Sequence, residues 1–116
     1  FINKGAKIAG GSDCPIEEGN PLFEFYAAIT RQDHQGFPDK GFQEQECVSP
    51  IEALKMLTTW GAHAEFQEQN KGKIKSSYKA DLTILSDDIT KIDSSKILKI
   101  KTLGTIVEGQ FVFNQL

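Results

Sequence analysis

Apolar residues in the first third of the chain recur at the spacing of one helical face. Leu22, Phe25 and Ile29 stand at i, i+3 and i+7, and Tyr26 adds the i+4 position. The run follows an Asn-Pro pair, which is typical of a helix start: Asn caps free N–H groups, and Pro at the first helical position sacrifices no hydrogen bond. The pattern therefore predicts a helix over residues 21–32.

A second helix is predicted over residues 49–64. Ser49 and Glu52 have the spacing of a capping box, with Pro50 at the first helical position. The apolar positions that follow give this helix a broad face to bury. They are Ala53, Leu54, Leu57, Trp60, Gly61 and Ala64. Between the two helices, residues 33–47 are polar and rich in Gly, Pro and Gln, which predicts a loop.

Short strands are predicted on either side of this helical region. Residues 6–13 are mostly small and apolar, and they are predicted to form a strand, centred on residues 7–12, that runs into a glycine-containing turn. Residues 82–85 are strand-like, and residues 94–98 suit one helical turn. Two β-rich runs follow, joined by Glu108-Gly109, a dipeptide that suits a two-residue hairpin. These two runs are residues 102–107 and 110–113.

The composition fits one folded domain and excludes several functional classes. Hydrophobic residues make up 39% and charged residues 25% of the 116 residues, as in globular domains. The net charge of -3 supplies no basic face for nucleic acid. No apolar run approaches the roughly 20 residues that span a bilayer, so neither nucleic acid nor membrane is expected as a partner. Cys14 and Cys47 are expected to be free thiols in a cytoplasmic protein, because no other feature indicates secretion.

Residues 11–15, Gly-Ser-Asp-Cys-Pro, resemble the end of the eighth barrel strand in the amidohydrolase superfamily. More narrowly, the segment is similar to amidohydrolase family 3, which includes N-substituted formamide deformylases. The resemblance continues in the right order along nearly the whole chain. The other matching segments are Asn20-Pro21-Leu22, Thr30-Arg31-Gln32-Asp33, the helix from Ser49, Lys71-Gly72, Ala80-Asp81-Leu82 and Val107-Glu108-Gly109.

The resemblance implies an α/β fold in which these residues are the C-terminal piece of a larger enzyme. Residues 1–70 would supply the last strand and two helices of a (β/α)8 TIM-type barrel, in which catalytic groups lie at the C-terminal ends of the strands. Residues 71–116 would form part of a composite β-sandwich built from both ends of the parent chain. The 116-residue chain alone is then expected to be inactive.

Asp13 is the site residue that the resemblance assigns, both as a metal ligand and as a catalytic group. The metal expected in the parent protein is divalent, usually zinc. One carboxylate oxygen can bind the ion while the other accepts a proton from the attacking water and passes it to the leaving amine. The metal would polarise the substrate carbonyl and make hydroxide available near neutral pH.

Most ligands that the family uses are absent from this chain. They are a His-x-His pair on the first strand, a carboxylated lysine or a carboxylate, and two further histidines. His34 and His63 are the two histidines here, and neither sits in a ligand motif. Cys14 replaces a small apolar residue and could line the pocket, but it is not assigned as a ligand. We therefore expect no tight zinc binding by these residues alone, because a catalytic zinc needs roughly three protein ligands.

Each candidate residue also has a plainer structural explanation. Asp13 could cap a turn, since Asp is common there. Glu17 and Glu18 could contact substrate from the loop after Asp13, although a solvated acidic loop explains them more simply. His34 beside Asp33 suggests a metal or general-base pair, but a lone exposed loop histidine is the simpler interpretation.

Two functions are compatible with the sequence. The first is hydrolysis of a C–N bond in a small-molecule amide, formamide or cyclic amide by a metal-dependent parent enzyme. The second is a non-catalytic β-rich interaction domain in which Asp13 is structural. The strand at 6–13 and the apolar helix faces lack neighbours in the chain. The piece is therefore also expected to form a homodimer that buries those faces or pairs this strand.

Overall fold

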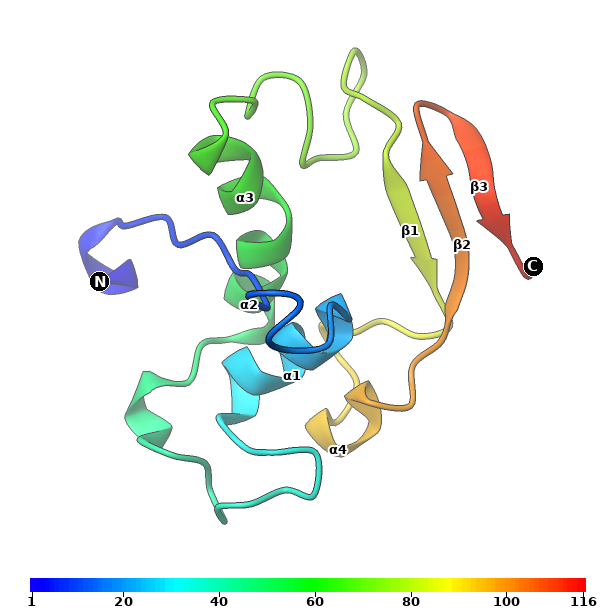
Figure 1. The fold of residues 1–116 in the computed structure, drawn as a ribbon. Helices are drawn as coiled ribbons and strands as arrows, with labels where there is room; N and C mark the ends of the chain where they lie inside the picture. Colours follow the sequence, from blue (N-terminus) through cyan, green and yellow to red (C-terminus); the bar gives the residue numbers. More distant parts are fainter.

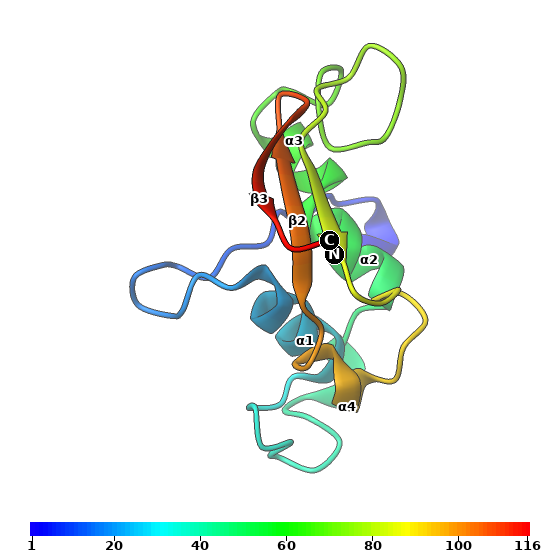
Figure 2. The ribbon, with the colours of Figure 1, turned by 90° about the vertical axis from the view of Figure 1, so that its right-hand side faces the viewer.

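The computed structural model describes residues 1–116 as a helical body with a three-stranded sheet beside it (Figure 1). Seen from the side in Figure 2, the strands lie in front of the upper helices, with α1 and α4 below them. In chain order the elements are a 3-10 helix (Ile2–Lys4), α1 (Pro21–Thr30), a second 3-10 helix (Glu44–Glu46), α2 (Pro50–Leu57), α3 (Thr59–Ala64), β1 (Leu82–Leu85), α4 (Ser94–Ile97), β2 (Thr102–Val107) and β3 (Gln110–Asn114). None of the helices combines the length and the apolar character needed to cross a bilayer.

Helix α1 begins as predicted but ends two residues before the predicted end. The Asn20 side chain caps the helix by accepting a hydrogen bond from Leu22 N (3.1 Å). The helix stops at Thr30 because Arg31 adopts a left-handed backbone conformation (φ 52°) that cannot continue it. The predicted apolar face is buried, and its most buried residues are Phe25 and Tyr26.

The prediction of one continuous helix over residues 49–64 is wrong, because the structure has two helices there. The predicted capping box is present: Glu52 N donates to Ser49 Oγ (3.3 Å), and Ser49 N donates to Glu52 Oε2 (2.8 Å). At Thr58 the backbone leaves the helical region (φ -130°, ψ -91°), and the Thr58 hydroxyl donates to the Leu54 carbonyl (2.7 Å). A β-branched residue that bonds to the preceding turn weakens the regular helical ladder. The helix therefore breaks, and α3 begins after it.

Gly72 packs into this break. Its backbone is left-handed (φ +86°), and a Cβ atom there would lie 2.9 Å from the Ala62 Cβ and 3.0 Å from the Thr58 carbonyl oxygen. Both the backbone conformation and the close approach require glycine. This part of the Lys71-Gly72 motif therefore has a structural role.

The hydrophobic core lies among α1, α2, α4 and the segments that flank α4. Six buried residues form it: Phe25, Tyr26, Ala53, Ile89, Ile97 and Ile100. Full burial of one large aliphatic or aromatic side chain stabilises a fold by roughly 1.5–3 kcal/mol. The short helix predicted at residues 94–98 is confirmed as α4, and its buried residue, Ile97, packs it against the helical body.

The sheet is an antiparallel meander in the order β1-β2-β3. The predicted strands are confirmed, with β3 extending one residue beyond the predicted end. Glu108 and Gly109 both have positive φ (51° and 80°), as a type I′ hairpin turn requires. Asp81 ties this turn to the segment before β1, because its Oδ1 accepts a hydrogen bond from Glu108 N (2.8 Å).

The strand predicted over residues 6–13, the expected last barrel strand, is absent. Its one backbone hydrogen bond to the helical body runs from Gly10 N to the Met56 carbonyl (3.0 Å). A strand requires a neighbour for its N–H and C=O groups, and no other strand of the structure lies alongside this segment. Instead the segment lies on α2, where a Cβ on Gly10 would be 3.4 Å from Leu57 Cδ2. The structure is therefore a mixed α/β fold with an antiparallel sheet.

Candidate functional site

Asp13 lies in an exposed turn that follows this segment. Its backbone is left-handed (φ 56°), a conformation that Asp tolerates better than most residues, and its carbonyl accepts a hydrogen bond from Ile16 N (2.9 Å). The Asp13 carboxylate makes no hydrogen bond or ion pair in the structure. A capping aspartate would use its carboxylate to accept a backbone N–H. Capping therefore does not account for this side chain.

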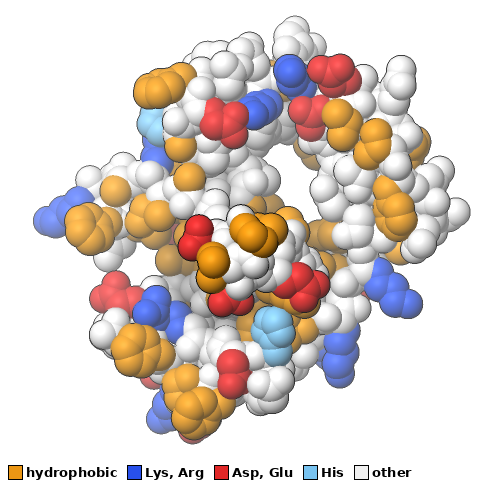
Figure 3. Space-filling model, in the orientation of Figure 1, with side chains coloured by type: hydrophobic (Ala, Val, Ile, Leu, Met, Phe, Trp, Pro, Cys, Tyr) orange, Lys and Arg blue, Asp and Glu red, His pale blue; other side chains and the backbone are white.

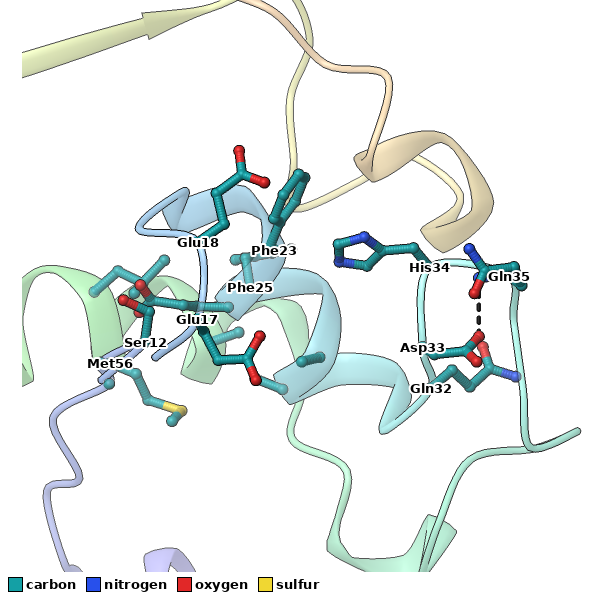
Figure 4. A pocket seen from close by; sticks show the side chains of 17 residues that line it. Ser12, Glu17, Glu18, Phe23, Phe25, Gln32, Asp33, His34, Gln35 and Met56 are labelled. Carbon is teal, nitrogen blue, oxygen red and sulfur yellow. Dashed lines mark hydrogen bonds between the residues drawn. The ribbon is translucent and has the colours of Figure 1, made fainter. Parts of the chain in front are cut away.

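A cleft of about 650 Å³ is lined by residues that precede and follow Asp13, but not by Asp13 itself (Figure 4). Its walls are residues 10–12, residues 17–18, parts of α1 and α2, and the loop at residues 32–35. The volume falls within the range of about 300–1,000 Å³ that is usual for small-molecule sites. Part of the lining is apolar, contributed by Phe23, Phe25, Ala27, Ala28, Ala53, Met56 and Leu57. The cleft is thus suited to a ligand with an apolar part.

Glu17 and Glu18 line the cleft together with Ser12. Both glutamates are exposed, as expected for a solvated acidic loop, but the loop also borders the cavity. Cys14, in the same turn, is a free and exposed thiol, and Cys47 is free and half-buried. The acidic loop thus borders the cavity, whereas Asp13 is not among the residues that line it.

His34 forms part of the cleft wall. Its ring centroid lies 4.3 Å from that of Phe23 and 6.5 Å from that of Tyr26. Figure 4 shows the imidazole directed toward Phe23 from the loop that follows α1. His34 is exposed, as expected for a loop histidine, yet it belongs to an aromatic group at the edge of the cleft.

The Asp33 carboxylate holds the loop and does not pair with His34. Asp33 Oδ1 accepts hydrogen bonds from Gln35 N (2.8 Å) and Phe37 N (2.9 Å). No hydrogen bond joins Asp33 to His34. Arg31 further anchors this loop, because its guanidinium lies over the Phe42 ring, 5.6 Å from the centroid. The two residues therefore do not form a general-base dyad in this structure.

The residues present do not make a complete metal site. No group of three or more His, Cys, Asp or Glu side chains in the chain could hold an ion. His63 lies on α3, outside the lining of the cleft, and its Nδ1 is 3.4 Å from Glu68 Oε1 without hydrogen-bond geometry. Asp13 is therefore at most one ligand of a site that needs further donors.

The model of the amidohydrolase family matches residues 1–113. The chain belongs to the amidohydrolase family. Among curated proteins, this amidohydrolase chain is 35% identical to the "Putative amidohydrolase YtcJ" of Bacillus subtilis (strain 168), over 99% of the chain and 22% of that relative. It is 27% identical to the N-substituted formamide deformylase of Arthrobacter pascens, over 94% of the chain and 20% of the relative.

A plant relative matches over a similar region. The protein LONG AFTER FAR-RED 3 of Arabidopsis thaliana is 30% identical over 97% of the chain and 19% of its own length. The amidohydrolase chain thus spans about a fifth of the length of the curated relatives that it matches. No solved structure matches the chain.

Sequence reasoning missed the cleft of this amidohydrolase chain. The Gly-Ser-Asp motif at residues 11–13 is visible in the sequence, but the helical pattern does not distinguish Phe23 from its neighbours, and it predicts His34 only as an exposed loop histidine. The available signal was that Phe23 falls outside the i, i+3, i+4, i+7 face of α1, so its ring is free to face another part of the chain.

Proposed function

We propose that this chain is part of a metal-dependent hydrolase that cleaves a C–N bond of the amide type. The family match and the deformylase relative support this class of reaction. The observation that carries the proposal is the position of Asp13. Its carboxylate is exposed and has no structural partner, and it directly follows Gly11 and Ser12, which line a cleft of small-molecule size.

Asp13 would act by moving a proton. As the water oxygen forms its bond to the carbonyl carbon, the carboxylate accepts the proton that the water loses. The C–N bond then breaks, and Asp13 donates this proton to the departing nitrogen, so that an acid and an amine are released. A divalent metal, zinc by the resemblance, polarises the carbonyl when bound, and Asp13 would be the ligand that this chain contributes to it.

In the full-length protein, residues 1–70 would complete a (β/α)8 barrel and residues 71–116 a composite β-sandwich. Residues 7–12 would then gain neighbouring strands on both sides. The remaining metal ligands would come from residues outside this chain, because these residues hold no complete ligand group.

The test is Asp13→Asn in the full-length protein. The amide cannot accept the proton, so kcat is expected to fall by about 10²–10⁴-fold. The fold should be unchanged because the Asp13 side chain is exposed and unpaired. Steady-state kinetics on an amide substrate measures the effect, with circular dichroism to verify folding.

Glu44→Gln, on the exposed second 3-10 helix, is the matched control and should keep full activity. A folded Asp13→Asn protein that retains more than about a tenth of the activity would remove Asp13 from the mechanism. The alternative function, a non-catalytic interaction domain, predicts that no amide is hydrolysed by either protein.

A further inference from the structure

We infer that His63 and Glu68 form a pH-sensitive latch between α3 and the turn that follows it, open when the imidazole is neutral and closed when it is protonated. The inference does not depend on the proposed hydrolase reaction, and both residues lie outside the lining of the cleft. Two observations support it: the position of one imidazole nitrogen, and the way in which the turn is tied to the rest of the chain.

The imidazole of His63 has one ring nitrogen turned toward the protein without a partner. Nδ1 is shielded from solvent and makes no hydrogen bond, although 42% of the side chain is exposed. An oxygen of the Glu68 carboxylate, Oε1, lies 3.4 Å from this nitrogen. Because a shielded polar atom without a hydrogen bond is unfavourable, the open arrangement leaves an interaction to be gained.

Protonation of the imidazole supplies the missing interaction. A neutral imidazole carries one N–H and an imidazolium carries two, so Nδ1 of the imidazolium always has a proton to donate. A hydrogen bond from imidazolium to carboxylate is charge-assisted, and is shorter and stronger than a neutral one. The Glu68 backbone N–H, then His63 and Lys7, hold the pKa of the Glu68 carboxyl below its ordinary value. The carboxylate is therefore ionised in the range, about pH 5 to 8, in which histidine side chains change charge.

The carboxylate belongs to a turn that is fixed at several other points. Gln67 N donates to the Ala62 carbonyl (2.8 Å), and Lys71 N donates to the Gln67 carbonyl (3.0 Å). The Tyr78 hydroxyl donates to the Glu68 carbonyl (3.0 Å). The turn leads directly into the glycine that packs into the break between α2 and α3. A bond from His63 to Glu68 would therefore fix this turn to α3 at one further point, just before that glycine.

The other charged groups around the pair keep their charge over the same pH range. Lys7, from the N-terminal segment, acts on the Glu68 carboxylate, but a lysine stays protonated well above neutral pH. Glu65 and Lys71, on either side in the turn, pair with each other. The imidazole is thus the group of this cluster that titrates between about pH 5 and 8.

The sign of the pH effect follows from the state that forms the bond. The latch needs a protonated imidazole, so its contribution to stability is present below the pH range in which the histidine titrates and is lost as the pH rises through it. The contribution also needs an ionised Glu68, whose lowered pKa keeps it ionised above the ordinary glutamate range. The latch is therefore closed at about pH 5.5 and open at about pH 7.5.

The experiment is thermal unfolding of the 116-residue chain, whose structure contains the pair, at pH 5.5 and pH 7.5. His63→Gln removes the titrating group, and Glu68→Gln removes the charge that it meets. The change in melting temperature from pH 7.5 to pH 5.5 should be more favourable in the unsubstituted chain than in either variant, by about 2 °C or more. His34→Gln is the matched control, since it removes the other histidine of the chain and should keep the full difference.

Hydrogen exchange locates the effect within the chain. The protection factors of the Gln67 and Lys71 amides should be about threefold higher at pH 5.5 than at pH 7.5, relative to the amides of α1. Glu68→Gln should abolish this difference. The inference is overturned if these protection factors are equal at the two pH values. It is also overturned if His63→Gln lowers the melting temperature by the same amount at both, because that result would assign the histidine a structural role alone.

Discussion

The helical body and the sheet of this molecule are held together in different ways. The six core residues all lie in or next to helices, and Leu85 is the one strand residue that packs against them. In contrast, all five residues of β3 are exposed. The sheet therefore depends mainly on its backbone hydrogen bonds, whereas the helical body depends on buried side chains.

The space between the two regions reflects the same difference. A cleft of about 740 Å³ lies between α2, α3, the loop at residues 71–74 and β1. Figure 3 shows the opening between the helical body and the sheet from the front. The radius of gyration, 14.7 Å, exceeds the value of about 13 Å expected for a compact chain of this length. Side chains thus fill the helical body but do not close the gap to the sheet.

The largest expected effect on stability comes from a substitution that creates a cavity in the core. Ile97→Ala removes a fully buried side chain and should lower the free energy of unfolding by about 2–5 kcal/mol. Val112→Ala, on exposed β3, should cost less than about 1 kcal/mol. Urea denaturation of the two variants measures this contrast. Equal losses would show that the sheet contributes as much buried packing as the helical body.

A smaller effect is expected at the break between α2 and α3. Gly72→Ala places a Cβ against Ala62 and Thr58 in a left-handed conformation, and we expect a loss of about 1–3 kcal/mol. Gly11→Ala is the matched control, because a Cβ there meets nothing within 4 Å and φ is not positive. Thermal unfolding compares the two, and similar melting temperatures would contradict the close approach at Gly72.

The third effect should be confined to the sheet. Asp81→Ala removes the hydrogen bond to Glu108 N at the hairpin turn, at a cost of about 1 kcal/mol. Hydrogen exchange should become faster in β2 and β3, while the amides of α1 and α2 keep their protection. Loss of protection in both regions would mean that the sheet and the helical body unfold as one unit.

The smallest expected effect is a change of stability with pH. It arises at Asp88, in the segment between β1 and α4. Hydrogen bonds from Thr90, then Lys91, lower the pKa of the Asp88 carboxyl to about 2. Because the folded-state pKa is depressed, the associated stability is present above the ordinary Asp pKa of about 4 and is lost as the pH falls toward 2. NMR titration of the carboxyl carbon should show this low midpoint. A midpoint near the ordinary value would show that these hydrogen bonds do not form.

Features encoded by neighbouring residues could be predicted from the sequence. The Asn20 cap, the Ser49–Glu52 capping box and the Glu108-Gly109 turn each depend on a few adjacent residues, and all three are present. The predictions of a strand at residues 6–13 and of an unbroken helix at residues 49–64 are wrong. A strand needs a neighbour far away in sequence, and the helix break depends on the Leu54 carbonyl and on packing by Gly72.

The candidate site, too, could be predicted only where it depends on neighbouring residues. Asp13 was identified through a local motif and a family resemblance, and its role stays a proposal. The cleft could not be predicted, because the acidic loop, the two helices and the His34 loop meet only in three dimensions. The expected homodimer also stays a prediction, which sedimentation at micromolar concentration tests.

The contact between Gly10 and Met56 has a mechanical consequence. Asp13 stands three positions beyond the one backbone hydrogen bond that fixes its segment to the helical body, and that bond ends on the last turn of α2, just before the break. A shift in that turn of α2 would therefore also move the segment that carries Asp13. A substitution at Gly72, which packs on the other side of the break, would thus displace the Asp13 carboxylate without touching it.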